Sequence, residues 1–258
     1  MMEVELKGRV VVISGGTDGL GLALADRLIE EGASVAVCGR DEARLSACRT
    51  RWDAAAADAI AVRADVTVPA DLESLVDAVV ARWGRIDGLV NNAGRSAAGT
   101  LETVADEVWR EDLDLKVLAA VRLTRLALSH LRASDRASVI NVLSVAARTP
   151  GAASLPTTAS RAAGLAITKA LSHELGPDGI RVNSILVGLV ESGQWRSRAE
   201  VAGRPVEEIY ASLAAAVPLG RVGRGEEFAD LAAFLLSDRA SFISGAAINL
   251  DGGMSPAL

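Results

Sequence analysis

The chain has 258 residues, half of them hydrophobic and only 3% aromatic, so its core must consist of Ala, Val, Leu and Ile. A formal net charge of −6 without any basic block argues against nucleic acid as the main partner. Two cysteines are too few for a disulfide framework, and the sequence shows neither a membrane-length apolar run nor a signal-peptide core. We therefore expect a soluble, cytoplasmic protein with no nucleic-acid and no membrane partner.

Short β-branched runs alternate with longer helical patterns along the whole chain. Strands are expected at 9–14, 34–39, 59–65, 86–94 (including an exit loop), 137–144, 180–187 and 245–253. Helices are expected at 21–32, 41–56, 72–84, 106–132, 157–175, 206–215 and 225–237, with a polar stretch of mobile character at 191–205. The alternation predicts βαβ units and a single α/β domain over 1–258, with a Rossmann-type, doubly wound parallel sheet of six or seven strands.

Glycines follow the first expected strand and precede the first expected helix, in "VVVISGGTDGLGLALADRL". Glycines let backbone and ligand approach closely, and N–H groups at a helix N-terminus can bind a pyrophosphate. The strand before and the helix after favour nucleotide binding over a purely steric role for these glycines. We expect this loop to contact the nucleotide through Gly15, Thr17, Asp18, Gly19, Leu20 and Gly21.

The ends of the next strands indicate which nucleotide is bound. The second strand ends at Gly39 and is followed by Arg40, which favours a 2′-phosphate, so NADP(H) is preferred over NAD(H). Asp18 argues the other way, because some NADP-dependent enzymes carry a base there, and Arg40 could also be a solvated turn residue. Further contacts are expected from the loops after the third and fourth strands, at Asp65, Val66, Asn91, Asn92, Ala93 and Gly94.

Five fragments in this order, "SGGTDGLG", "NNAG", "INVLSV", "IRVNSILVG" and "INLDGG", resemble the short-chain dehydrogenase/reductase family over nearly the whole chain. The resemblance implies hydride transfer between a nicotinamide cofactor and a carbonyl or alcohol. It also implies homotetramers or homodimers packed through the helices at 106–132 and 157–175, and a region at about 191–217 that closes over the substrate. Additional cofactor contacts are then expected at Arg161, Gly188, Val190 and Ser192.

The family's catalytic set is an Asn, a Ser, a Tyr and a Lys, and only Ser144 clearly matches it, thirteen residues before position 157. The Tyr and Lys positions, four residues apart on one helix face, hold Thr157 and Arg161, and the Asn position holds Lys116. A threonine hydroxyl is too weak an acid to replace the tyrosine. Arginine stays charged and can hold ribose hydroxyls, but it cannot shuttle protons.

These replacements leave several hypotheses open. If Lys116 points into the site, burial and Arg161 would lower its pKa, so that it could donate the proton; it could instead clamp an anionic substrate group or lie exposed. Tyr210, the only tyrosine, is a replacement acid or a packing residue. The leading interpretation is an NAD(P)-dependent oxidoreductase; the alternatives are a catalytically silent NADP(H)-binding sensor or regulatory protein, and a reaction without net redox change.

Overall fold

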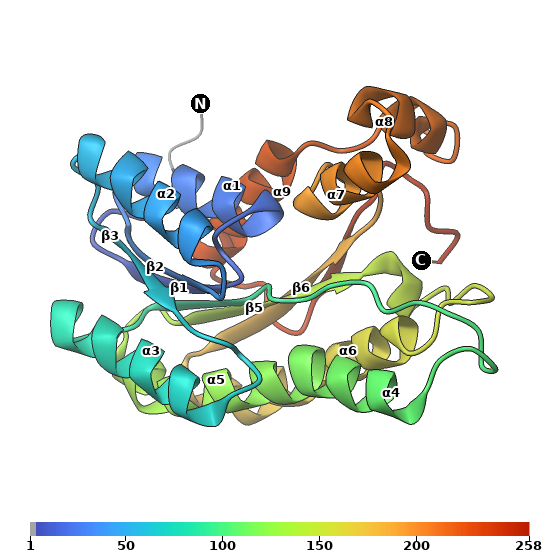
Figure 1. The fold of residues 1–258 in the computed structure, drawn as a ribbon. Helices are drawn as coiled ribbons and strands as arrows, with labels where there is room; N and C mark the ends of the chain where they lie inside the picture. Colours follow the sequence, from blue (N-terminus) through green and yellow to red (C-terminus); the bar gives the residue numbers. More distant parts are fainter. Residues whose placement is uncertain (1–3, 258) are drawn as a thin grey trace.

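The computed structural model describes residues 4–257. Its centre is a seven-stranded, all-parallel sheet in the order β3-β2-β1-β4-β5-β6-β7 (Figure 1). This arrangement confirms the predicted doubly wound α/β fold and fixes the number of strands at the upper of the two expected values. The strands are β1 (Val10–Ser14), β2 (Ser34–Gly39), β3 (Ala59–Arg63), β4 (Gly88–Asn91), β5 (Ser138–Ser144), β6 (Arg181–Val187) and β7 (Ala247–Leu250).

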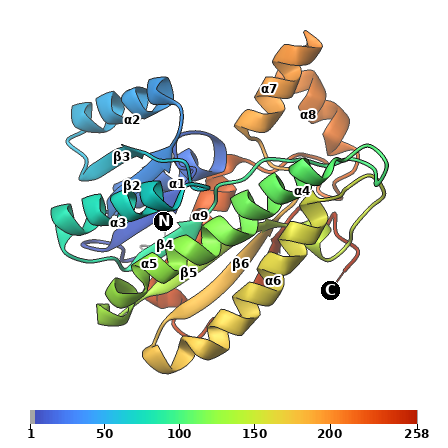
Figure 2. The ribbon, with the colours of Figure 1, turned by 60° about the horizontal axis from the view of Figure 1, so that its bottom comes forward.

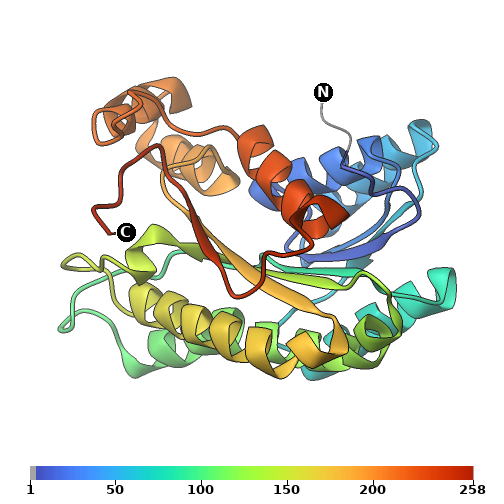
Figure 3. The same ribbon diagram turned by 180° about the vertical axis from the view of Figure 1, so that it is seen from behind.

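Helices cover both faces of the sheet. One face carries α1 (Gly19–Glu30), α2 (Glu42–Ala54) and α9 (Gly225–Leu236), and the other carries α3 (Pro69–Trp83), α5 (Ala119–Ala133) and α6 (Thr157–Glu174) (Figure 1). Figure 2 shows α4 (Asp106–Leu113) running on into α5 beside α6, while α7 (Gly193–Ala202) and α8 (Val206–Ala214) stand out from the body of the fold. Seen from behind, β7 forms the outer edge of the sheet, next to β6 (Figure 3). Within residues 4–257, no helix has the length and apolarity required to cross a membrane.

Alternating side chains of the strands build two large cores, one on each face of the sheet. Along β1, Val11 and Ile13 pack with α1 and α9, whereas Val10 and Val12 pack with α3 and α5. Because both faces are covered, the central strands can be apolar at nearly every position, as parallel strands of this fold class are. Small aliphatic side chains therefore fill both layers, in agreement with the low aromatic content.

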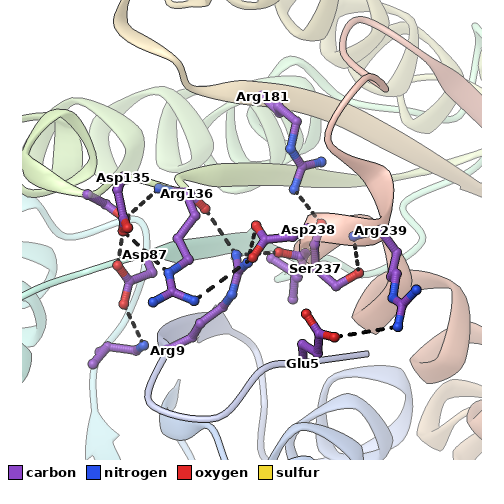
Figure 4. A network of polar contacts seen from close by, with 12 residues as sticks. Glu5, Arg9, Asp87, Asp135, Arg136, Arg181, Ser237, Asp238 and Arg239 are labelled. Atoms are coloured by element: carbon purple, nitrogen blue, oxygen red, sulfur yellow. Dashed lines mark hydrogen bonds and ion pairs between the residues drawn. The ribbon is translucent and has the colours of Figure 1, made fainter. Parts of the chain in front are cut away.

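A polar network ties the amino ends of the strands together (Figure 4). Arg9, which is 1% exposed and directly precedes β1, donates to the backbone oxygens of Leu236 at 2.7 Å and Arg136 at 3.0 Å. Its other terminal nitrogen pairs with Asp238 at 2.5 Å. The network joins the start of β1 to the end of α9 and the segment before β5. It lies at the end of the sheet away from the loops that follow the strands, so we assign it a stabilising role.

Two segments differ from the sequence-based expectation. The helix expected at 106–132 is interrupted by a π-helix at Asp114–Leu118, between α4 and α5. The stretch at 191–205, expected to be polar and mobile, contains helix α7. It lacks an apolar stripe because most of the described side chains of α7 are exposed, but its Gln, Arg, Ala and Glu residues favour a helix and Gly203 ends it in the left-handed conformation.

Candidate active site

The candidate site lies at the carboxyl ends of β1 and β4. These strands are neighbours, Ser14 opposite Asn91, and the chain leaves them toward opposite sides of the sheet. Open α/β sheets bind ligands at such a switch point. The Ser14 hydroxyl accepts hydrogen bonds from the N–H groups of Asn92 at 3.0 Å and Ala93 at 3.1 Å. The loops after the two strands are thereby held together.

The glycine loop between β1 and α1 forms a tight cradle. Gly15 has a φ of 68°, and a Cβ there would lie 2.9 Å from the Cα of Ala93; a Cβ at Gly21 would lie 2.4 Å from the Gly15 oxygen. The first turn of α1 directs N–H groups without intrahelical partners toward this loop. The Asn92 side chain donates to the oxygens of Ser14 at 3.0 Å and Gly15 at 2.8 Å, so it braces the cradle from behind. This geometry suits a pyrophosphate.

Asp18 is the acidic residue of the loop, and two arginines neutralise it. Its Oδ1 accepts from the Gly19 N–H at 2.7 Å and from Arg196 of α7 at 2.6 Å, and its Oδ2 pairs with Arg44 of α2 at 3.0 Å. The carboxylate is therefore a helix cap inside a cluster of cations, and it does not act as an isolated negative charge beside the cradle. The sequence analysis missed Arg44, which lies in the first turn of α2, four residues after Arg40.

Arg40 lies at the rim of the cradle. Its side chain is 65% exposed and reaches the Oδ2 of Asp65 at 3.3 Å. The other oxygen of Asp65 accepts from the N–H and hydroxyl of Thr67, at 2.9 and 2.7 Å. Val66 beside it is buried in the core below α3 and α5. Arg40 and Arg44 thus present two guanidinium groups near the end of β2, where a 2′-phosphate would require them.

Lys116 is buried in the π-helix, with no exposed side-chain surface. Its amine contacts the Oδ1 of Asp112 in α4 and donates to the hydroxyl of Thr157 in α6 at 3.0 Å. The Oδ2 of Asp112 accepts from the Ser160 hydroxyl at 2.6 Å. Burial lowers the pKa of the Lys116 amine to about 8; Arg161 acts in the same direction and Asp112 against it. Of the roles left open from the sequence, the exposed helix lysine is therefore wrong.

Thr157 presents its hydroxyl group to this amine. Thr157 Oγ1 accepts a second hydrogen bond, from the N–H of Ala97 in the loop after β4, at 2.9 Å. Ser144 ends β5, and its hydroxyl accepts from the Ala146 N–H at 3.3 Å. That hydroxyl keeps its own proton for donation to a ligand.

Arg161 follows Thr157 by one helical turn and spans the gap to the loop after β4. It is half-buried, donates to the Val142 oxygen at 2.7 Å, and has its pKa lowered to about 10 by burial. A Cβ at Gly94 would lie 2.5 Å from one guanidinium nitrogen. The arginine side chain, which is longer than the lysine of the family pattern, therefore fits here because residue 94 is glycine.

The segment after β6 contains three further expected residues, and its last part lies against the glycine loop. Gly188 packs so closely that a Cβ would lie 2.6 Å from the Asp251 Cβ, and Val190 forms a bridge to Gly223. Ser192 precedes α7, and the next N–H, of Gly193, would lie 3.3 Å from a Cβ on Gly19. The start of α7 therefore lies over the cradle.

Tyr210 lies on α8, and burial raises the pKa of its hydroxyl, with Glu191 acting in the same direction. A raised pKa makes it a weaker proton donor, which disfavours its role as the replacement acid. The sequence analysis overlooked Asp112 and Ser160. Asp112 precedes Lys116 by four residues, a spacing that signals an ion pair on a helix, but Ser160 meets it only through the packing of α4 against α6.

A family model described as enoyl-(acyl carrier protein) reductase matches residues 15–255. The L-fucose dehydrogenase of Bos taurus is 34% identical over 253 residues, which cover 98% of this chain and 91% of that protein. An NADPH-bound short-chain oxidoreductase from Pseudomonas aeruginosa PAO1, described as containing an atypical catalytic center, superposes with a TM-score of 0.91 at 35% identity, covering 97% of this chain and 98% of that one.

The L-sorbose reductase of Gluconobacter frateurii, complexed with NADPH and L-sorbose, superposes with a TM-score of 0.93 at 33% identity, covering the whole of both chains. The family model and these three proteins match along nearly the full length of the chain. The chain is therefore an oxidoreductase of the short-chain dehydrogenase/reductase family.

Proposed function

We propose that the protein transfers a hydride between a nicotinamide dinucleotide and a small carbonyl or alcohol substrate, with Lys116, Ser144, Thr157 and Arg161 as an altered catalytic set. The observation that carries this proposal is the buried Lys116 amine, which contacts Thr157 and has a pKa lowered to about 8. A proton donor works best when its pKa lies near the working pH. In the family pattern the proton donor is a tyrosine paired with a lysine, and here Thr157 and Arg161 stand at those positions.

The cofactor proposed is NADP(H) in preference to NAD(H). The cradle of Gly15, Gly19 and Gly21 fits the pyrophosphate, and Arg40 with Arg44 fits a 2′-phosphate. The NADPH-bound relatives support the same choice. The remaining cofactor contacts proposed are Thr17, Asp18, Leu20, Asp65, Val66, Asn92, Ala93, Gly94, Gly188, Val190 and Ser192.

Each member of the catalytic set has a distinct part in the proposed reaction. The reduced dinucleotide supplies the hydride when it is bound. Ser144 orients the substrate oxygen with its hydroxyl proton, and Arg161 holds the ribose hydroxyls of the cofactor. Lys116 is the source of the proton that the substrate oxygen gains on reduction. We further propose that the chain acts as one domain over 1–258, that 191–217 covers the substrate, and that the protein is a homotetramer or homodimer.

Nicotinamide absorbance under steady-state conditions tests the proposal, with a panel of ketoses, ketoacyl thioesters, other ketones, aldehydes and alcohols. We expect turnover that Ser144→Ala and Lys116→Met each reduce about 10²- to 10⁴-fold, while calorimetry shows that both variants still bind NADPH. Dinucleotide binding without turnover across the panel would instead support the silent binding protein. Products formed without oxidation of the cofactor would support the non-redox alternative.

A further inference from the structure

Asp112 is a buried carboxylate, 3% exposed, for which the proposed reaction has no part. It lies in the last turn of α4, and both of its oxygens have partners. Oδ1 accepts from the Lys116 amine one helical turn later, and Oδ2 accepts from the Ser160 hydroxyl of α6 at 2.6 Å. Hydrogen bonds to an ionised group are short and strong, so this carboxylate fixes the Lys116 amine relative to α6.

The fixed amine determines what the Thr157 hydroxyl can do. A hydroxyl group has two acceptor positions and one proton. The Lys116 amine at 3.0 Å and the Ala97 N–H at 2.9 Å occupy both acceptor positions of Thr157 Oγ1. Among the residues that the structure describes, none accepts a hydrogen bond from this hydroxyl. Its proton is therefore the one group that Thr157 can offer to a ligand.

We propose that Asp112 is a positioning residue that holds the Lys116 ammonium on Thr157, so that Thr157 relays the proton to the substrate oxygen; this inference rests on the proposed function. As the hydride reaches the carbonyl carbon, the Thr157 O–H bond breaks and the substrate gains that proton. In the same step an N–H proton of Lys116 passes to the Thr157 oxygen. The substrate becomes an alcohol, Thr157 is restored, and Lys116 is left neutral until it regains a proton from solvent.

The relay removes the objection that a threonine hydroxyl is too weak an acid. In a concerted transfer Thr157 never becomes an alkoxide, so the acidity that matters is that of the Lys116 ammonium behind it. The threonine then serves as a fixed hydroxyl of the kind that a bound water supplies in other relays. The hydrogen bonds that Thr157 accepts from Lys116 and Ala97 fix the direction of its own O–H bond.

Three charged groups face the amine from the elements packed around it: Asp112 from α4, Arg161 from α6 and Arg95 from the loop after β4. Of these, only Asp112 favours the charged form of Lys116. Neutralising Asp112 should therefore lower the pKa of the amine and remove the proton that reduction consumes. A purely structural role for Asp112 would change stability without changing this pKa.

The first measurement uses the cofactor-free protein. The chain has three lysines, and Lys7 and Lys169 are exposed, so ¹³C-lysine NMR can follow the Lys116 titration with two internal references. We expect Asp112→Asn to move the Lys116 titration at least about one pH unit lower. The matched control is Asp114→Asn, which removes the partner of Arg122 on the same helical segment and should leave the Lys116 titration in place.

The second measurement is the pH dependence of carbonyl reduction. Asp112→Asn should move the alkaline limb of the rate profile by the same amount as the NMR titration, so that lower pH restores part of the activity. Adding Asp112→Asn to Lys116→Met should change the residual activity by less than about threefold, because Asp112 acts through Lys116. An unmoved titration and limb, or an equal further loss in the double variant, would overturn the proposal.

Thr157 provides a test that does not depend on whether Asp112→Asn folds. Thr157→Val keeps the shape and removes the hydroxyl, and should lower kcat about 10²- to 10⁴-fold, whereas Thr157→Ser should stay within about tenfold of the wild type. Near-wild-type turnover by Thr157→Val, with Lys116→Met and Ser144→Ala inactive, would refute the relay and leave the proposed function standing. Full activity of Lys116→Met would refute the proposed function itself.

Discussion

The buried amine of Lys116 should make the two directions of the reaction respond oppositely to pH. Reduction consumes a proton and needs the charged amine, whereas oxidation releases one and needs the neutral amine. With the pKa lowered to about 8, about nine-tenths of the amines are charged at pH 7 and about one-tenth at pH 9. We expect the rate of reduction to fall about tenfold per pH unit above 8, and the rate of oxidation to fall about tenfold per unit below 8.

Steady-state rates in both directions between about pH 6 and pH 10 test this expectation. Lys116→Met should lose both limbs along with about 10²- to 10⁴-fold of kcat, which corresponds to about 3–5 kcal/mol of barrier. Lys116→Arg, which stays charged at every pH, should also lose the limbs. If the slope of the wild-type pH–rate profile persisted in Lys116→Met, another group would be titrating, and the assignment of the pH dependence to Lys116 would be refuted.

The same shift has a consequence for folding that requires no substrate. The amine binds its proton more weakly in the folded chain, at about 8, than in the unfolded chain, at 10.5. The unfolded chain therefore holds more protons between these values, and the free energy of unfolding rises with pH across this window, by about 3 kcal/mol in total. Urea unfolding of the wild type and Lys116→Met at about pH 7.5 and pH 10 measures the difference. An equal pH response of the two proteins would contradict the lowered pKa of the buried Lys116 amine.

Three further variants test other parts of the structure. Arg40→Ala should weaken NADPH binding about tenfold or more and leave NADH binding unchanged, with Arg51→Ala as control; calorimetry showing equal losses for both dinucleotides would contradict the 2′-phosphate role. Arg9→Met should lower the free energy of unfolding in urea by about 3–5 kcal/mol, because it leaves buried carbonyl groups unpaired, against about 0–1 kcal/mol for the exposed Arg239→Met. Arg196→Ala should release the start of α7 from the glycine loop and speed NADPH dissociation severalfold in stopped-flow fluorescence; an unchanged rate would show that the ion pair has no such role.

The fold could be predicted because it depends on local patterns. The strands are short runs rich in β-branched residues, most of the helices have an apolar spacing, and short connections between them permit little besides a parallel sheet. The glycine loop could be located because only glycines tolerate its close contacts, such as those of Gly15 and Gly21. Ser144 could be placed as well, because the end of its apolar strand can be recognised in the sequence.

The charge balance of the site could not be predicted in the same way. Whether Lys116 is buried depends on how α4 and α6 pack, and the contact between Asp112 and Ser160 joins residues 48 positions apart. The break in the helix expected at 106–132 leaves no composition signal, because its residues suit an α-helix as well as a π-helix. The contacts of Asp18 with arginines from α2 and α7 likewise arise only once those helices lie beside the glycine loop.

The π-helix at Asp114–Leu118 makes this arrangement depend on chain length as well as on side-chain chemistry. A π-turn accommodates one residue more than an α-turn over about the same rotation, so the faces of α4 and α5 stay in phase across it while the residues within the turn are displaced by one position. Deleting Leu115 would restore regular α-helical bonding and shorten the spacing of Asp112 and Lys116 from four residues to three, so we expect the lysine amine to lose its present contacts with Asp112 and Thr157. The deletion would thus lower the activity although every residue of the catalytic set is still present.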